Sequence, residues 1–98
     1  MTIEDVLEVK DVRVTRGDIR AGQHWSPYGC PIALAVSRAY PDYAVGVSRI
    51  SIQLSQLGEY QWRADLPNEC QQFIRDFDYG KEVAPISFQL KMEPYHRS

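Results

Sequence analysis

The chain has 98 residues, of which 44% are hydrophobic and 24% charged, and its formal net charge is −2. This length fits one globular domain over residues 1–98 with a modest core, and the composition excludes an intrinsically disordered chain. Because 11 basic residues stand against 13 acidic ones, a strongly basic nucleic-acid-binding domain is also excluded. We therefore expect no nucleic-acid partner.

The sequence shows no pattern typical of export or membrane insertion. Residues 1–11 carry four acidic side chains and no apolar run, so they do not resemble a secretory signal. The longest mostly apolar stretch, Cys30–Val36, is far shorter than the ~20 residues of a membrane span. Cys30 and Cys70 are too few for a disulfide scaffold, although one bridge between them stays open. We expect a cytoplasmic protein with reduced thiols and no membrane partner.

The first elements are predicted by short local patterns. Residues 12–14 alternate between valine and arginine, which is typical of a strand with one solvated face. Thr15 and Asp18 have the spacing of a capping box, with aspartate in place of the usual glutamate. This pair predicts a short helix that ends near Ala21 and is followed by Gly22.

A turn-rich loop and a second helix follow. The loop, Gln23–Gly29, contains Trp25 and Tyr28, and loops on a rigid scaffold often carry function. Pro31 suits the first turn of a helix, and Pro41 ends it. The predicted helix has a face of small apolar residues at helical spacing: Ile32, Ala35, Val36 and Ala39.

Three alternating runs predict strands in the middle of the chain. The first is Val45 and Val47, the second Ile50, Ile52 and Leu54, and the third Tyr60, Trp62 and Ala64, joined through Gly58. The first two runs are out of phase, so we expect a bulge or a turn near Ser48 and Arg49.

The last elements show the clearest periodicity. Pro67 is expected to start a helix that stops at Gly80, with Cys70, Phe73, Ile74 and Phe77 on one face. A half-buried strand follows, with Ile86, Phe88, Leu90 and Met92 alternating, and this strand is expected to pack against the helical face. We expect the tail from Glu93 to fray. The fold class is therefore α+β, a small, mainly antiparallel sheet of four to five strands with two to three helices on one face.

Two parts of the sequence resemble a group of small phage and prophage proteins. The first is the pattern Val12-Arg13-Val14-Thr15, Asp18-Ile19 and Gly22, with Cys30-Pro31-Ile32-Ala33-Leu34-Ala35 and Arg38-Ala39. The second is Phe73-Ile74, Phe77-Asp78, Gly80, Val83, Pro85, Phe88 and Leu90. The resemblance implies an origin in a mobile element. It implies no particular reaction and no site residue.

Cys30 is the residue that best fits an enzymatic hypothesis. A thiol at a helix N-terminus can have a lowered pKa, and His24 could act as its base with Asp18 or Asp42 as orienter. Nothing in the spacing requires these groups to meet, so packing of a buried thiol is the preferred interpretation. We expect no catalytic residue and a protein that is not an enzyme.

The sequence does not predict a metal or a nucleotide cofactor. Soft donors are limited to His24, Cys30, Cys70 and His96, without a Cys-x-x-Cys or His-x-x-x-His pair. No glycine-rich phosphate-binding loop is present either. We expect no metal site and no cofactor.

A binding site is predicted where aromatic and arginine residues coincide in the first half of the chain. Arginine binds phosphate and carboxylate in a fork, aromatic faces stack on bases, and both residue types anchor protein interfaces. The candidate partner-binding residues are Arg16, Arg20, Trp25, Tyr28 and Arg38. The alternative is a solvated surface on which the aromatic rings only cover the rim.

The resemblance, together with the absence of catalytic motifs, implies a non-enzymatic binding protein of a phage or mobile element, located in the cytoplasm of the bacterial host. The expected role is counter-defence by stoichiometric sequestration of a host protein or of a nucleotide signal, a phosphorylated small molecule. The alternatives are a small cysteine-dependent enzyme that uses Cys30 and His24, or an accessory protein of the virion or its assembly. The sequence leaves the oligomeric state open, including a homo-oligomer.

Overall fold

The computed structural model describes residues 9–56 and 61–94. In chain order the elements are β1 (Lys10–Val14), α1 (Arg16–Ala21), α2 (Pro31–Ala39), β2 (Ala44–Val47), β3 (Ser51–Ser55), β4 (Gln61–Asp65), α3 (Asn68–Asp78), β5 (Ile86–Leu90) and β6 (Glu93–Pro94). The predicted residues Gly58, Tyr60 and His96 lie outside the described ranges.

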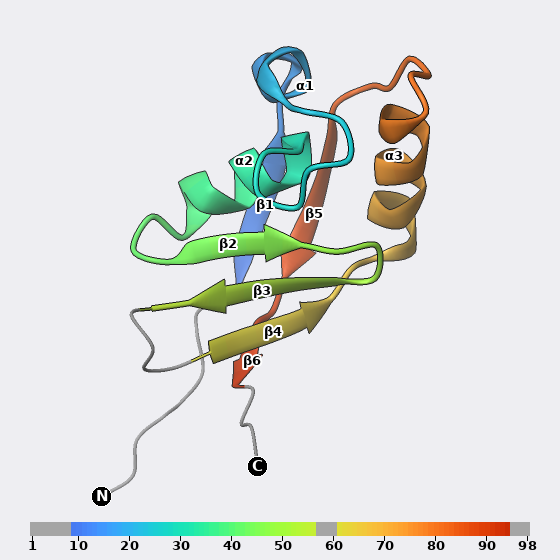
Figure 1. Cartoon of the computed structure of the whole chain (residues 1–98). Coiled ribbons are helices and arrows are strands. Elements are labelled where there is room, and N and C mark those ends of the chain that lie inside the picture. Colours follow the sequence, from blue (N-terminus) through green and yellow to red (C-terminus); the bar gives the residue numbers. More distant parts are fainter. Residues whose placement is uncertain (1–8, 57–60, 95–98) are drawn as a thin grey trace, which may run out of the picture.

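The predicted α+β class with antiparallel strands is confirmed, but the strands divide into two sheets. One sheet has the order β2-β3-β4-β6, and the other is a ribbon in which β1 pairs with β5. All pairs are antiparallel, and Val12 lies opposite Phe88 at the centre of the ribbon. Figure 1 shows the ribbon crossing behind the hairpins of the larger sheet. The first and last predicted strands are thus neighbours.

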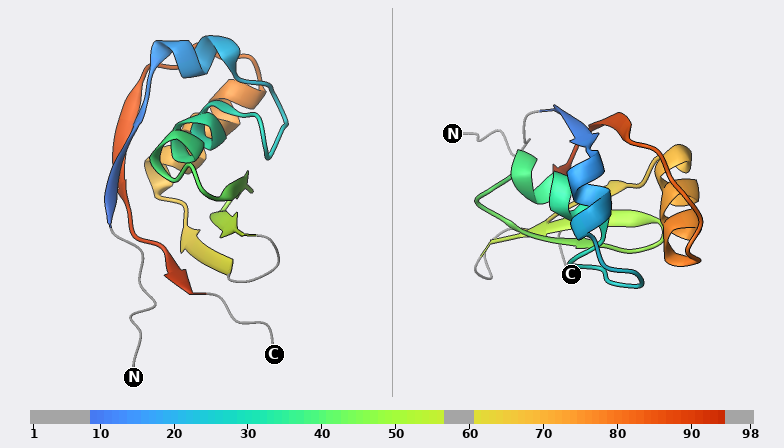
Figure 2. Two further views of the ribbon diagram at one scale, coloured as in Figure 1. Left: turned by 90° about the vertical axis from the view of Figure 1, so that its left-hand side faces the viewer. Right: turned by 90° about the horizontal axis from the view of Figure 1, so that it is seen from above.

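Helix α2 lies between the two sheets and fills the centre of the core. It packs against β1, β2 and α1, and Figure 2 shows it enclosed between the ribbon and the larger sheet. Ile32 and Val36, on its apolar face, are completely buried. The small residues of this face allow the strands to approach the helix closely, as the sequence pattern predicts. At its C-terminal end, Lys10 Nζ donates a hydrogen bond of 2.9 Å to the carbonyl oxygen of Ala39.

Helix α1 has the capping box that the sequence predicts. The Thr15 hydroxyl accepts a hydrogen bond from the Asp18 N–H at 3.1 Å, and Asp18 Oδ2 accepts one from the Thr15 N–H at 2.9 Å. The predicted end of the helix near Ala21, followed by Gly22, is also confirmed. Since both bonds join residues three apart, this helix start depends only on local sequence.

Helix α3 presents its predicted apolar face to the core. The four residues of this face, Cys70, Phe73, Ile74 and Phe77, are buried and belong to the same core cluster as Phe88 and Leu90 of β5. Gly80 follows the helix with φ 81°, which favours glycine and ends the helix. Figure 1 places α3 at one end of the molecule, beside the turn between β2 and β3.

Two sequence expectations need correction. Ile50 does not share a strand face with Ile52, because the out-of-phase runs are separated by a turn in which Ser48 N–H bonds to the Ser51 carbonyl oxygen at 2.8 Å. Ile50 lies in this turn and is 60% exposed. The tail was expected to fray from Glu93, but Glu93–Pro94 forms β6, which pairs with β4. Met92, completely buried just before β6, anchors this segment to the core.

Gly22, the residue after α1, lies close to Pro31 at the start of α2, which gives a stability prediction. A Cβ atom at Gly22 would lie 2.6 Å from the Cδ and Cγ atoms of Pro31, closer than real Cβ contacts. We expect Gly22→Ala to lower the free energy of unfolding by about 1–2 kcal/mol, as overpacking does. The measurement is urea denaturation of the purified variants.

The matched control for Gly22 is Gly17 in α1. A Cβ atom there would meet only the Thr15 hydroxyl oxygen at 3.6 Å, an ordinary contact. Gly17→Ala should raise stability by about 0.5–1 kcal/mol, because alanine is favoured over glycine inside a helix. Equal stability changes in both variants would contradict the steric explanation for Gly22.

Candidate functional site

Trp25 is displayed on the surface in a strained conformation. Its φ angle is 57°, a left-handed value that bulky residues rarely adopt, and its side chain is 55% exposed. The backbone N–H of Trp25 donates a hydrogen bond of 2.8 Å to Asp78 Oδ1 at the end of α3. This bond ties the loop to a helix far away in the chain. Strain of this kind is frequent at binding and active sites, where the surrounding structure maintains it.

The loop that carries Trp25 is held in place by further hydrogen bonds. The Gln23 N–H bonds to the Gly29 carbonyl oxygen at 2.8 Å, which closes the loop on itself. The Val47 N–H of the edge strand β2 bonds to the Pro27 carbonyl oxygen at 2.9 Å. The loop is therefore fixed to both α3 and the larger sheet. Trp25 is presented in one position rather than on a free segment.

Trp25 lines a groove between α3 and the turn that joins β2 and β3. The groove has a volume of about 220 Å³. Its lining residues are Trp25, Arg49, Ile50, Gln71, Ile74, Arg75, Asp78 and Tyr79. The rings of Trp25 and Tyr79 meet edge to face, with centroids 5.1 Å apart and planes at 84°. We call this feature the Trp25 groove.

The Trp25 groove collects most of the exposed large apolar side chains of residues 9–56 and 61–94. Five large apolar side chains are exposed in the described residues, and three of them line this groove: Trp25 at 55%, Ile50 at 60% and Tyr79 at 66%. A second hollow of about 350 Å³ adjoins it and shares Trp25 and Asp78. Large apolar side chains gathered in one concave place are typical of an interaction site.

Tyr28, a predicted partner-binding residue, lies apart from the Trp25 groove. It is 76% exposed and contributes to a different hollow of about 160 Å³ over β2, β3 and β4. A Cβ atom on Gly46 of β2 would be 3.5 Å from the Tyr28 ring. The structure thus separates Trp25 from Tyr28, although the two residues are close in sequence.

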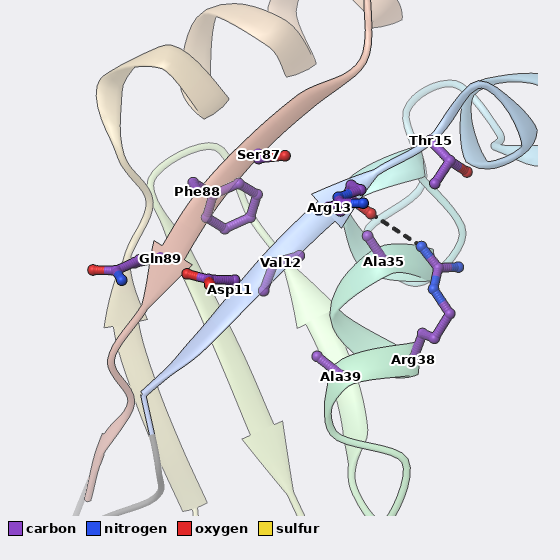
Figure 3. A pocket seen from close by; sticks show the side chains of 10 residues that line it. All are labelled: Asp11, Val12, Arg13, Thr15, Ala35, Arg38, Ala39, Ser87, Phe88 and Gln89. Atoms are coloured by element: carbon purple, nitrogen blue, oxygen red, sulfur yellow. Dashed lines mark hydrogen bonds between the residues drawn. The ribbon is translucent and has the colours of Figure 1, made fainter.

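The three predicted arginines do not join Trp25 either. Arg16 and Arg20 project from α1 into solvent and line none of the hollows that Trp25 lines. Arg38 Nη1 and Nη2 donate to the two carboxylate oxygens of Asp18 at 2.9 and 2.7 Å. Arg38 Nη2 also donates to the Arg13 carbonyl oxygen at 3.0 Å. Figure 3 shows the Arg38 side chain extending from α2 toward Arg13 of β1 in a shallow pocket of about 580 Å³.

Asp18 and Arg38 form a structural ion pair. Asp18 is 6% exposed and accepts bonds from both Thr15 and Arg38, which joins α1, α2 and β1. The Arg38 guanidinium holds the pKa of the Asp18 carboxyl below its usual value, against the opposing effect of burial. Because its donors are directed to Asp18 and Arg13, Arg38 has a structural role that joins α2 to α1 and β1.

Cys30 is a buried thiol at the start of α2, as the preferred interpretation of the sequence predicts, and its pKa is not lowered as the enzymatic alternative requires. Cys30 caps α2, and its Sγ accepts the Ala33 N–H at 3.4 Å, but the residue is only 3% exposed. Burial raises the pKa of the Cys30 thiol and outweighs the hydrogen bonds of the helix end. The His24 ring stacks on Phe77 with centroids 4.3 Å apart, and no hydrogen bond joins His24 to Cys30. Burial likewise raises the pKa of Cys70 to about 12.

Metal and membrane sites can be assessed for the described part of the chain. Residues 9–56 and 61–94 contain no cluster of three or more histidine, cysteine or acidic side chains that could hold a metal ion. Among the helices of these residues, none combines the length and apolar character of a membrane span.

The sequence pattern identified Trp25 but missed its neighbours. The sequence pattern places Ile50 on a strand face and Arg49 near a turn, without bringing either of them to Trp25. Tyr79 and Arg75 belong to the solvent side of α3, where sequence periodicity separates exposed from buried residues but does not show which exposed ones meet a distant loop. A possible signal was Tyr79 itself, a large aromatic residue beside the helix stop Gly80.

Comparison of the chain with protein-family models, with curated proteins and with solved structures found no match.

Proposed function

We propose that this chain is a non-enzymatic binding protein of a phage or mobile element that acts by occupying a surface of a host protein. The observation that carries the proposal is the convergence of Trp25, Ile50 and Tyr79 in one groove, each more than half exposed. Tryptophan, tyrosine and arginine are the residues that most often anchor protein interfaces. The backbone of Trp25 is held in a left-handed conformation by its hydrogen bond to Asp78, which supports the role of Trp25 as a preorganised anchor.

A protein surface fits the Trp25 groove better than a nucleotide does. The Trp25 and Tyr79 rings stand at 84° to each other, so they do not form two parallel faces that could enclose a base. Arg38, expected to bind phosphate, is directed to Asp18 instead. These features support a protein partner over a nucleotide signal.

The biological setting follows from the sequence resemblance to small phage and prophage proteins. On that basis, the role that we propose is counter-defence in the cytoplasm of a bacterial host, with one copy of this protein blocking one copy of a host protein. Such a role needs affinity and a stable surface but no catalytic group.

The test is affinity capture from bacterial lysate, followed by calorimetry with the purified partner. Wild type should bind with a fixed stoichiometry, and Trp25→Ala should weaken binding by about 30-fold, which corresponds to the ~2 kcal/mol of one interface anchor. The matched control is Tyr28→Ala, which removes an even more exposed aromatic side chain outside the groove and should bind as wild type.

Three results would contradict the proposal. The first is a captured partner that binds Trp25→Ala as tightly as wild type. The second is a loss of binding that is as large in Tyr28→Ala as in Trp25→Ala. The third is a nucleotide as the captured molecule, detected by mass spectrometry of small molecules, which would support sequestration of a signal instead. Circular dichroism of each variant verifies that the fold is unchanged.

A further inference from the structure

We infer that the Trp25 groove recognises an acidic segment of its partner, with an apolar side chain seated beside Trp25 and Tyr79 and carboxylates paired with Arg49 and Arg75. The inference rests on the proposed function, because it names the chemistry of the partner at the same groove. The inference is based on the charged side chains that line the groove beside its apolar residues.

Two arginines line the groove from different elements. Arg49 comes from the turn between β2 and β3, and Arg75 comes from α3. Arg75 Nη1 donates to Gln72 Oε1 at 3.2 Å, which is a neutral acceptor. Within residues 9–56 and 61–94, neither arginine forms an ion pair, whereas Arg38 is paired with the carboxylate of Asp18. Arginines of this kind are suited to pair with carboxylates of a partner.

The acidic residue in the groove is committed to the fold. Asp78 is the acidic member of the lining, and its Oδ1 accepts the Trp25 N–H at 2.8 Å. The lining therefore contains two positive charges and one negative charge, and the negative one is directed to the backbone of the loop. A partner with lysine or arginine beside its anchor would meet net repulsion, whereas an acidic one would be attracted.

The apolar part of the groove limits which side chain of the partner can bind there. Ile74 is 8% exposed and forms part of the buried side, while Ile50 and the edge-to-face rings of Trp25 and Tyr79 are exposed around it. The volume of about 220 Å³ leaves room for an apolar side chain of the partner. An apolar residue flanked by aspartate or glutamate satisfies both the apolar surface and the arginines.

The experiment is a selection of random peptides displayed as a library against the immobilised full-length protein. Wild type should enrich peptides with one apolar residue flanked by acidic ones, and rising salt should weaken their binding. The double charge reversal Arg49→Glu with Arg75→Glu should bind the enriched peptides at least tenfold more weakly by fluorescence anisotropy. A new selection on this variant should enrich lysine and arginine around the same apolar residue.

The matched control is Arg16→Glu with Arg20→Glu, the same change of net charge on exposed residues of α1. It should keep the wild-type preference and affinity, because these side chains lie outside the groove. If it loses as much affinity as the groove variant, the inference is overturned, because the acidic peptides are then attracted by the net charge of the protein rather than by the groove.

The remaining outcomes separate the inference from the proposed function. Enrichment of peptides without acidic residues, combined with loss of binding in Trp25→Ala, would overturn the inference and leave the proposed function intact. Enriched peptides that bind Trp25→Ala as tightly as wild type would overturn both. A wild-type selection that enriches no peptide at all would also overturn the inference.

Discussion

Replacing Phe73 with alanine is expected to lower the free energy of unfolding by about 3–5 kcal/mol. Phe73 is 5% exposed, and its ring stacks on Phe77 with centroids 6.4 Å apart in the core face of α3. Truncation removes apolar contacts and leaves a cavity that the helix can only partly fill. Since small domains unfold with only ~5–15 kcal/mol, the loss is a large fraction of the total. Urea denaturation followed by circular dichroism measures it.

The control for Phe73 is its neighbour Gln72. Gln72 is exposed on the same helix and bonds only to Asp76 and Arg75 at the surface. Gln72→Ala should change stability by less than about 0.5 kcal/mol. An unchanged midpoint for Phe73→Ala would show that the apolar face of α3 does not contribute to the core.

Replacing Arg38 with alanine is expected to cost about 2–3 kcal/mol at neutral pH. The change removes the bonds to both Asp18 oxygens and to the Arg13 carbonyl, and leaves a largely buried carboxylate without its cation. The cost stays below the ~3–5 kcal/mol of a fully buried pair, because the Arg38 side chain is 54% exposed to water. Arg16→Ala, on a fully solvated arginine, is the control and should be neutral.

The loss in Arg38→Ala should depend on pH in a defined direction. Arg38 lowers the pKa of the Asp18 carboxyl in the folded protein, so this group contributes stability above its unfolded pKa of ~3.9. That contribution is lost as the pH falls through the lower, folded-state pKa. The stability difference between wild type and Arg38→Ala should therefore be full near neutral pH and shrink below about pH 4. Unfolding curves across this range measure it, and a constant difference would exclude the ion pair as its cause.

Sequence patterns predicted several elements because the interactions that form them are local. The capping box of Thr15 and Asp18 joins residues three apart, and Pro31 favours a helix start by its own geometry. The alternation in β5 and the helical face of α3 record which side of each element is buried. These features depend on backbone preferences and periodicity over a few residues. They therefore hold in any arrangement of the elements.

The sequence identified one residue of the candidate site. Trp25 was identified by residue type and loop context, and both are local properties. The groove also needs Ile50 and Tyr79, which come from a turn and from the end of a helix. Their meeting depends on the packing of α3 beside the turn between β2 and β3. The packing of the elements also brings Arg38, a predicted binding residue, into an ion pair with Asp18.

The sequence by itself therefore determined most of the elements, most of their buried faces and one aromatic anchor, whereas the tertiary structure decided β6, the two sheets and the groove. Pairing of β1 with β5 uses backbone N–H and C=O groups that every non-proline residue carries, so the residues of a strand do not specify its partner. The partner is selected by how apolar faces from the whole chain fill one core around α2. Residues distant in the sequence, such as Trp25 and Asp78, meet only as a consequence of that packing.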